Sequence, residues 1–95
     1  MADIYFLDWD EQNEEHLARH GIQPSEVRQI LSNRHVTTPN PRDEQDGRVL
    51  LIGETHGGRV LTISLAPTSD DAIWRPVTGW IATDEEKTKF ERAVR

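Results

Sequence analysis

The stretch that decides the fold is RVLLIGETHGGRVLTISL, residues 48–65. It contains two apolar runs separated by the polar segment Thr55-His56-Gly57-Gly58. Paired glycines allow the tight turn of a hairpin, so the stretch predicts two antiparallel strands, 48–53 and 59–65. The first run is apolar on both faces, which is typical of a covered central strand. In the second run apolar and hydroxyl residues alternate, which predicts a single inner face.

The segment that follows this hairpin predicts one more strand and a last helix. A turn at 67–71 leads into a strand over 72–82, and Pro76 inside it indicates an edge strand or a bulge, because proline has no backbone donor. Thr83 and Glu86 form a capping box, which predicts a helix running to about Val94.

The segment before the hairpin predicts a strand and a first helix. Residues 4–7 are β-prone. Asp10 suits the N-cap of a helix with an acidic first turn that runs to about His20. Gly21 stands where a left-handed C-terminal cap is favoured.

A second, short helix is expected from Pro24, with Val27, Ile30 and Leu31 on one face. Residues 32–47 contain prolines among charges and read mostly as loop, with a brief strand at Val36-Thr37. We therefore expect an α+β fold in the order β-α-α-β-β-β-α. It has one antiparallel sheet of about four strands, two N-terminal helices on one side and a C-terminal helix.

Length and composition limit the chain to one domain, residues 1–95. There are no cysteines, which excludes disulfides and thiolate metal sites. The N-terminal Met-Ala-Asp-Ile-Tyr does not resemble a signal peptide, and no apolar run approaches the roughly 20 residues of a membrane span. We expect a soluble cytoplasmic protein.

The net charge of −6 is unevenly distributed. Residues 1–47 carry ten acids and four Lys or Arg, whereas residues 48–95 carry seven of each. Nucleic-acid binders usually have a basic surplus, because phosphate contacts supply most of their affinity. Any contact with RNA is therefore expected to be local, through arginines of the second half.

Several motifs, taken in their order and spacing, resemble the BrnT family of bacterial toxins, which have a RelE-like fold. The resemblance extends from Phe6 to Glu91. The motifs are Trp9-Asp10, Arg19-His20-Gly21-Ile22, the hairpin from Arg48 to Leu61, Arg75 with Thr78, and Ala82-Thr83 with Glu86.

The resemblance implies the toxin of a type II toxin–antitoxin pair, an endoribonuclease that cuts messenger RNA and halts translation. It also implies an antitoxin partner that is dimeric and binds DNA. The chain departs from similar sequences at Gly79-Trp80, where a basic residue two places after Thr78 is common. If that residue binds phosphate in the family, catalysis here is weaker, differently targeted or absent.

Metal-independent RNA cleavage needs a base, an acid and one or two cations around the phosphate. The second half of the chain offers candidates on or beside adjacent strands and on the last helix. These candidate catalytic residues are Arg75, Arg48, Arg59, Glu54, His56 and Lys87. Arg48 and Arg59 bracket the hairpin, and with Arg75 they could converge on a phosphate from one sheet face.

Structural explanations compete with these roles. Strand-end arginines can pair with Glu54 or Asp71, and polar residues such as His56 are ordinary at hairpin tips. His16 and His20 share a helix face, but no third ligand is apparent, so we expect neither a metal nor another cofactor.

Trp74 and Trp80 are expected on one strand face, either in the core or as a partner-binding patch. Two further functional classes stay open beside the toxin. One is a non-catalytic protein-binding module on the same fold. The other, a DNA-binding regulator, ranks last because no helix has a basic recognition face.

Overall fold

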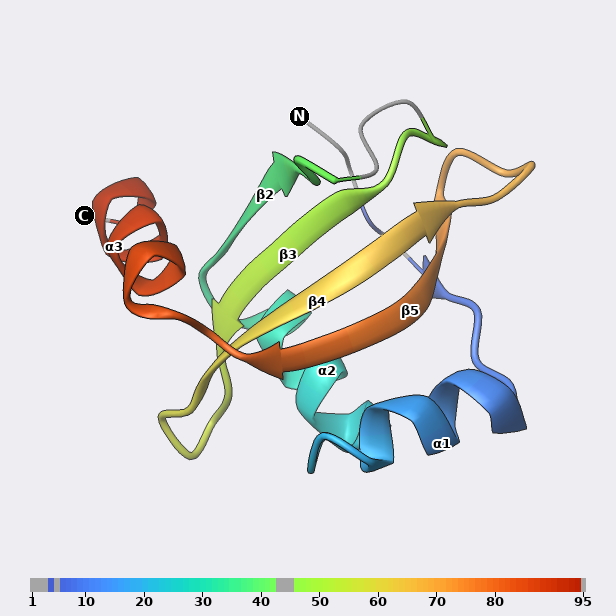
Figure 1. Ribbon diagram of the computed structural model, residues 1–95, viewed down its shortest axis with the longest axis horizontal. Coiled ribbons are helices and arrows are strands. Elements are labelled where there is room, and N and C mark those ends of the chain that lie inside the picture. Colours follow the sequence, from blue (N-terminus) through green and yellow to red (C-terminus); the bar gives the residue numbers. More distant parts are fainter. Residues whose placement is uncertain (1–3, 5, 43–45, 95) are drawn as a thin grey trace.

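The computed structural model describes residues 4, 6–42 and 46–94, and it confirms the α+β class. Within these residues, three helices and five strands follow one another (Figure 1). They are β1 (Phe6–Leu7), α1 (Glu11–Ala18), α2 (Pro24–Ser32), β2 (His35–Pro39), β3 (Val49–Glu54), β4 (Val60–Pro67), β5 (Ile73–Ile81) and α3 (Asp84–Ala93). None of the helices in these ranges is long and apolar enough to cross a membrane.

The strands form one mixed sheet in the order β1-β5-β4-β3-β2. β3 pairs antiparallel with both β2 and β4, β4 pairs antiparallel with β5, and β1 pairs parallel with β5. The prediction of one antiparallel sheet of about four strands is therefore confirmed only in part, because the described sheet has five strands and its β1–β5 pair is parallel. Of the strand predicted over 4–7, only Phe6–Leu7 is formed within the described residues, and Tyr5 lies outside them.

The extra strand is β2, in the segment expected to be mostly loop. His35–Pro39 has little apolar periodicity, but each of its five residues pairs with a residue of β3. The partner strand supplies the hydrogen bonds that local propensity does not, because β preference depends strongly on context. Pro39 is tolerated because β2 is an edge strand of the described sheet.

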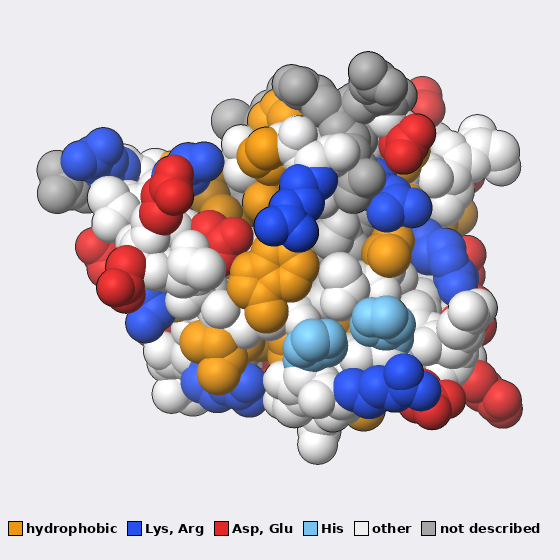
Figure 2. Space-filling model, viewed as in Figure 1, with side chains coloured by type: hydrophobic (Ala, Val, Ile, Leu, Met, Phe, Trp, Pro, Cys, Tyr) orange, Lys and Arg blue, Asp and Glu red, His pale blue; other side chains and the backbone are white. Residues whose placement is uncertain are grey.

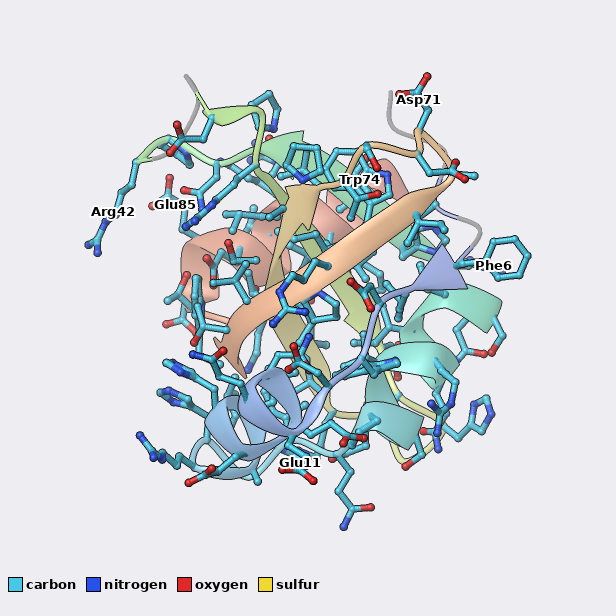
Figure 3. All side chains as sticks on the ribbon, turned by 90° about the vertical axis from the view of Figure 1, so that its right-hand side faces the viewer. Phe6, Glu11, Arg42, Asp71, Trp74 and Glu85 are labelled. Carbon is cyan, nitrogen blue, oxygen red and sulfur yellow. The ribbon has the colours of Figure 1, made fainter. Side chains whose placement is uncertain are left out.

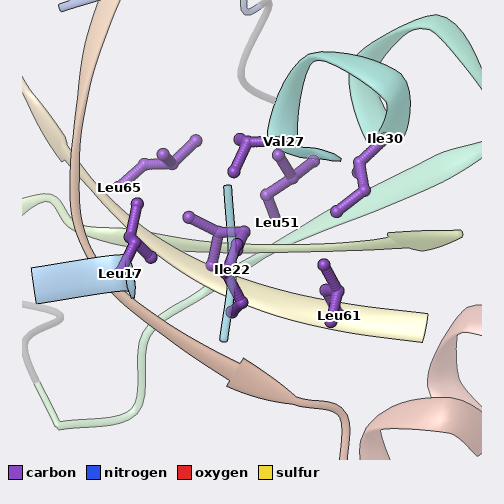
Figure 4. Packing of buried hydrophobic residues seen from close by; sticks show 8 residues of the cluster. Leu17, Ile22, Val27, Ile30, Leu51, Leu61 and Leu65 are labelled. Atoms are coloured by element: carbon purple, nitrogen blue, oxygen red, sulfur yellow. The ribbon is translucent and has the colours of Figure 1, made fainter. Parts of the chain in front are cut away.

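The helices cover the two faces of the sheet unequally. α1 and α2 lie together against one face, and α3 lies apart from them on the other (Figure 1). The larger core cluster joins side chains of α1, α2 and the loop between them to alternate residues of β3 and β4 (Figure 4). Each fully buried Leu or Ile contributes about 1.5–3 kcal/mol, so this face supplies most of the hydrophobic stabilisation.

The helix starts agree with the predicted caps. Asp10 accepts a hydrogen bond from the Asn13 N–H, and Asn13 returns one to the Asp10 N–H. Thr83 and Glu86 form the predicted capping box of α3. α1 ends at Ala18, two residues earlier than expected, and Gly21 has the predicted left-handed backbone with φ of 73°.

The proline in β5 produces the predicted bulge. Ser64 pairs with Thr78 but Leu65 pairs with Pro76, so β5 contains one extra residue at this point. A single extra residue reverses the faces of the residues beyond it. Trp74 therefore packs against the core beneath α1 and α2, and Trp80 packs on the α3 side. The prediction that the two tryptophans share a face is wrong for this reason.

Candidate active site

A groove of about 570 Å³ lies on the α3 side of the sheet. It forms because α3 packs mainly against β2 and β3, which leaves the rest of that face uncovered. Leu50 and Ile52 of β3 and Trp80 of β5 make its apolar part, and Ser64 and Thr78 add hydroxyl groups. We call it the α3-side groove. Figure 2 views this face and shows apolar side chains at its centre with Lys and Arg beside them.

In the part of the chain that the structure describes, three cationic side chains line the α3-side groove: Arg42, Arg48 and Lys89. Glu85 and Glu86 of α3 line it as well. Figure 3 shows Arg42 and Glu85 on the same side of the sheet, although they are 43 residues apart in the sequence.

 The fold thus brings residues from distant parts of the sequence to one groove, and none of Arg42, Lys89, Glu85 or Glu86 was among the predicted site residues.

Arg48 and Arg75 occupy the same row across the sheet. Val49 pairs with Leu65 on β4, so Arg48 stands one residue further along, beside Ala66, and Ala66 pairs with Arg75 on β5. Neighbouring strands are about 4.8 Å apart, which places the two arginine Cα atoms about 10 Å from each other. Ala66 is two residues beyond Ser64, so this row lies on the groove side of the sheet. Of the two, Arg48 lines the groove, whereas Arg75 is not among its described lining residues.

Arg75 has acidic partners at the end of β1. Its Nη2 donates to Oδ2 of Asp10 at 2.6 Å, and its Nη1 lies 3.7 Å from Oδ2 of Asp8. The Asn13 N–H is the main cause that lowers the pKa of Asp10, and the hydrogen bond from Arg75 is the next. Arg75 thus has a structural reason to be in this strand, since its guanidinium pairs with the carboxylates between β1 and α1.

Arg59 does not join the other two arginines. In an antiparallel hairpin the starts of the two strands lie at opposite ends, and Arg48 and Arg59 precede β3 and β4 respectively. Arg59 instead donates to Oε2 of Glu26 at 2.8 Å and to the carbonyl of Gly21 at 3.4 Å. The expected convergence of three arginines on one phosphate is therefore wrong for Arg59.

Glu54 and His56 also lie at the far end of the sheet. Six residues of extended strand separate Glu54 from Arg48, about 20 Å at the usual rise. His56 Nδ1 is 3.1 Å from Nδ2 of Asn33, and the same amide donates to the Glu54 carbonyl at 2.9 Å. These two candidates line a second hollow with Arg34 and the end of α3, apart from the α3-side groove.

Lys87 and the two tryptophans take separate positions. Lys87 is on α3 but is not among the residues that line the groove, whereas Lys89 is. Trp80 lines the groove and donates from Nε1 to Glu86 at 2.9 Å. Trp74 is half-buried against the larger core, and its Nε1 has no hydrogen-bond partner among the described residues.

Glu86 is the groove residue that the sequence pattern predicts only as part of a helix cap. Its Oε1 accepts from Trp80, from the Thr62 hydroxyl and from the Thr83 N–H. Burial raises the pKa of Glu86, but these hydrogen bonds together lower it by more, so the pKa lies below the ordinary glutamate value. The capping-box motif accounts for only one of the three donors, so the sequence contained no signal for the other two.

The fold and the groove define a small α+β domain with one open sheet face that carries clustered cations. The family model described as the ribonuclease toxin BrnT of type II toxin–antitoxin systems matches residues 9–86. The chain therefore belongs to this family, as the order of its motifs predicted. A comparison with curated proteins finds no match. The matched segment includes Arg42, Arg48, Arg75 and Glu86 but ends before Lys89.

Proposed function

We propose that this protein is the toxin of a type II toxin–antitoxin pair, an endoribonuclease that cleaves RNA in the α3-side groove and so blocks translation. The observation that carries the proposal is the gathering of Arg42, Arg48 and Lys89 around one groove in a chain of a ribonuclease-toxin family. The cleavage is proposed to need no metal ion, because side chains of this groove can supply the charges that the reaction requires.

The cations act on the phosphate. As the 2′-hydroxyl attacks the neighbouring phosphorus, negative charge develops on the phosphoryl oxygens, and fixed cations stabilise it. Arg48 lines the groove, which supports this role. Arg75 stands in the same sheet row and can approach the phosphate from the β1 edge. An arginine can bind two phosphate oxygens at once, which also orients the phosphate.

The acidic net charge does not oppose this proposal. Much of it comes from exposed acids in the first half, among them Glu11, Glu14 and Glu15 of α1, which packs against the opposite face. Phosphate binding depends on the charges close to the phosphate, because salt screens electrostatic interactions beyond about 8–10 Å. Among the described residues, the groove lining carries three cations and two carboxylates.

The test is cleavage of a mixed-sequence RNA by the purified protein in the presence of EDTA, together with growth after induced expression. Arg48→Ala should reduce both cleavage and growth arrest, whereas Arg28→Ala, an exposed arginine on α2, should leave them at the wild-type level. A wild type that binds RNA but never cleaves it, and that leaves growth unchanged, would replace this proposal by the non-catalytic binding module.

We also propose that a cognate, dimeric DNA-binding antitoxin neutralises the protein. Membership of a type II toxin family supports this, and so do exposed apolar side chains: Phe6 is 66% exposed and Ile81 is 60% exposed. Trp80 on the groove is the better candidate of the two predicted partner-binding tryptophans, since Trp74 packs in the core. Co-expression with the product of the adjacent gene, followed by affinity purification, should recover a complex that no longer cleaves RNA.

A further inference from the structure

Glu86 is the carboxylate held most firmly in the α3-side groove. Its Oε1 accepts hydrogen bonds from Nε1 of Trp80 at 2.9 Å, from Oγ1 of Thr62 at 3.0 Å and from the Thr83 N–H at 2.9 Å. These donors belong to β5, β4 and the N-cap of α3. The carboxylate is therefore fixed with respect to both the sheet and the helix.

The other oxygen of Glu86 is available to a ligand. Within the described ranges, the hydrogen bonds that Glu86 accepts all end on Oε1, and none ends on Oε2. The residue lines the groove and is only partly buried. A substrate in the groove can thus approach Oε2 without displacing the three donors.

The charged groups around Glu86 come from two parts of the fold. Glu85 and Lys89 line the groove from α3, and Arg42 and Arg48 line it from the segment between β2 and β3. The described groove residues of β4 and β5 are neutral. A carboxylate among phosphate-binding cations repels phosphate, so Glu86 weakens substrate binding, and a role in the reaction would offset that cost.

We propose that Glu86 is the general base of RNA cleavage in this groove, an inference that rests on the proposed function. Oε2 takes the proton of the 2′-hydroxyl while O2′ bonds to phosphorus and the bond between phosphorus and O5′ breaks. The departing O5′ takes a proton from water, and Glu86 later returns its proton to water. The products are a 2′,3′-cyclic phosphate and a 5′-hydroxyl end.

The ionisation of Glu86 agrees with this role. Burial raises its pKa, but the donors Thr83, Trp80 and Thr62 lower it by more, and the pKa falls below its ordinary value. The carboxylate is then charged at neutral pH, as a general base must be, and the lowered pKa also makes it a weaker base than an ordinary glutamate. Removal of one donor should raise this pKa and move the acidic limb of the pH–rate profile upward.

The experiment measures kcat, KM and the pH–rate profile of RNA cleavage for wild type, Glu86→Gln, Trp80→Phe and Glu91→Gln. Glutamine retains the capping-box acceptor but cannot take the proton. Glu86→Gln should lower kcat by about 100-fold or more, the usual contribution of a general base. Its KM should stay the same or fall, because a like charge beside the phosphate is removed. Glu91→Gln, an exposed carboxylate on the same helix, should behave as wild type.

Each outcome decides between this inference and the broader proposal. A folded Glu86→Gln protein that cleaves at the wild-type rate would overturn the inference and leave the ribonuclease proposal intact. If Glu86→Gln does not fold, Trp80→Phe decides, because an acidic limb that stays at the wild-type pH contradicts the role of Glu86. A wild type that cleaves no RNA would overturn both. Products that end in a 5′-phosphate would overturn the mechanism in which the 2′-hydroxyl attacks.

Discussion

Arg75 and Asp10, 65 positions apart in the sequence, are joined by a hydrogen bond of 2.6 Å between Nη2 and Oδ2. Asp10 is also the N-cap of α1, so the bond ties the start of that helix to β5. The arginine that the sequence singled out as catalytic therefore has a structural partner, and its two possible roles can be separated by mutation.

Arg75→Ala should reduce RNA cleavage by about 100- to 1,000-fold, the usual effect of removing one donor from a site of developing charge. Arg75→Lys should restore little of this, because an ammonium group lacks the two-pronged geometry of guanidinium. The control is Asp10→Asn, which keeps an N-cap side chain but loses the ion pair. Equal losses in Arg75→Ala and Asp10→Asn would mean that Arg75 acts only through the helix start.

His56→Ala should leave the cleavage rate within a few-fold of wild type. His56 lies with Glu54 at the end of β3 opposite Arg48, about 20 Å away along the strand, and its ring is held by Asn33. The measurement is the RNA cleavage rate compared with that of Arg48→Ala. Loss of cleavage in a folded His56→Ala protein would place the active site in the second hollow instead.

Gly79→Ala should lower the free energy of unfolding by about 1–3 kcal/mol, the usual cost of overpacking. A Cβ at this position would lie 2.7 Å from Cδ1 of Ile63 and 2.9 Å from Cδ2 of Leu17, both fully buried. Gly57→Ala is the matched control, since its Cβ would meet only the Thr55 hydroxyl at 3.8 Å. Urea denaturation of both variants checks the difference, and equal stabilities would contradict the close packing of α1 on β5.

Thr83→Ala should cost about 1 kcal/mol, because the Glu86 N–H loses its side-chain acceptor. For a domain of this size the melting temperature should fall by roughly 4–8 °C. Thr83→Ser keeps the hydroxyl and should melt close to wild type. Thermal denaturation followed by circular dichroism distinguishes them, and an unchanged Thr83→Ala protein would show that α3 does not depend on this cap.

Stability should fall as the pH is lowered, partly through Glu86. The pKa of Glu86 in the folded protein is below the ordinary value near 4.3. The ionised carboxylate therefore contributes to the free energy of unfolding above that pH, and this contribution is lost as the pH falls through the folded-state pKa. Glu86→Gln removes the titrating group. The difference in unfolding free energy between wild type and Glu86→Gln should therefore shrink between pH 6 and pH 3, and a constant difference would contradict the lowered pKa.

Local signals in the sequence were enough to predict most of the helices and strands and the family to which the chain belongs. The hairpin at 48–65, the caps at Asp10 and Thr83 and the bulge at Pro76 depend on residues close together in the chain, so their types and spacing predict them. The order of the motifs also predicted membership of the BrnT family, which the family model confirms. Of β2, only Val36-Thr37 was expected as a brief strand; its full length escaped prediction because its stability comes from pairing with β3 and not from its own residues.

The site depended on the tertiary structure. Strand direction separated Arg59, Glu54 and His56 from Arg48, and the one-residue bulge moved Trp74 and Trp80 to opposite faces. The partial cover by α3 opened the groove that collects Arg42, Arg48 and Lys89, and pairing across β4 and β5 brought Thr62 and Trp80 to Glu86. Sequence periodicity specifies which residues form an element, but the site was decided by register and by which face each helix covers, since both arise from contacts between distant residues.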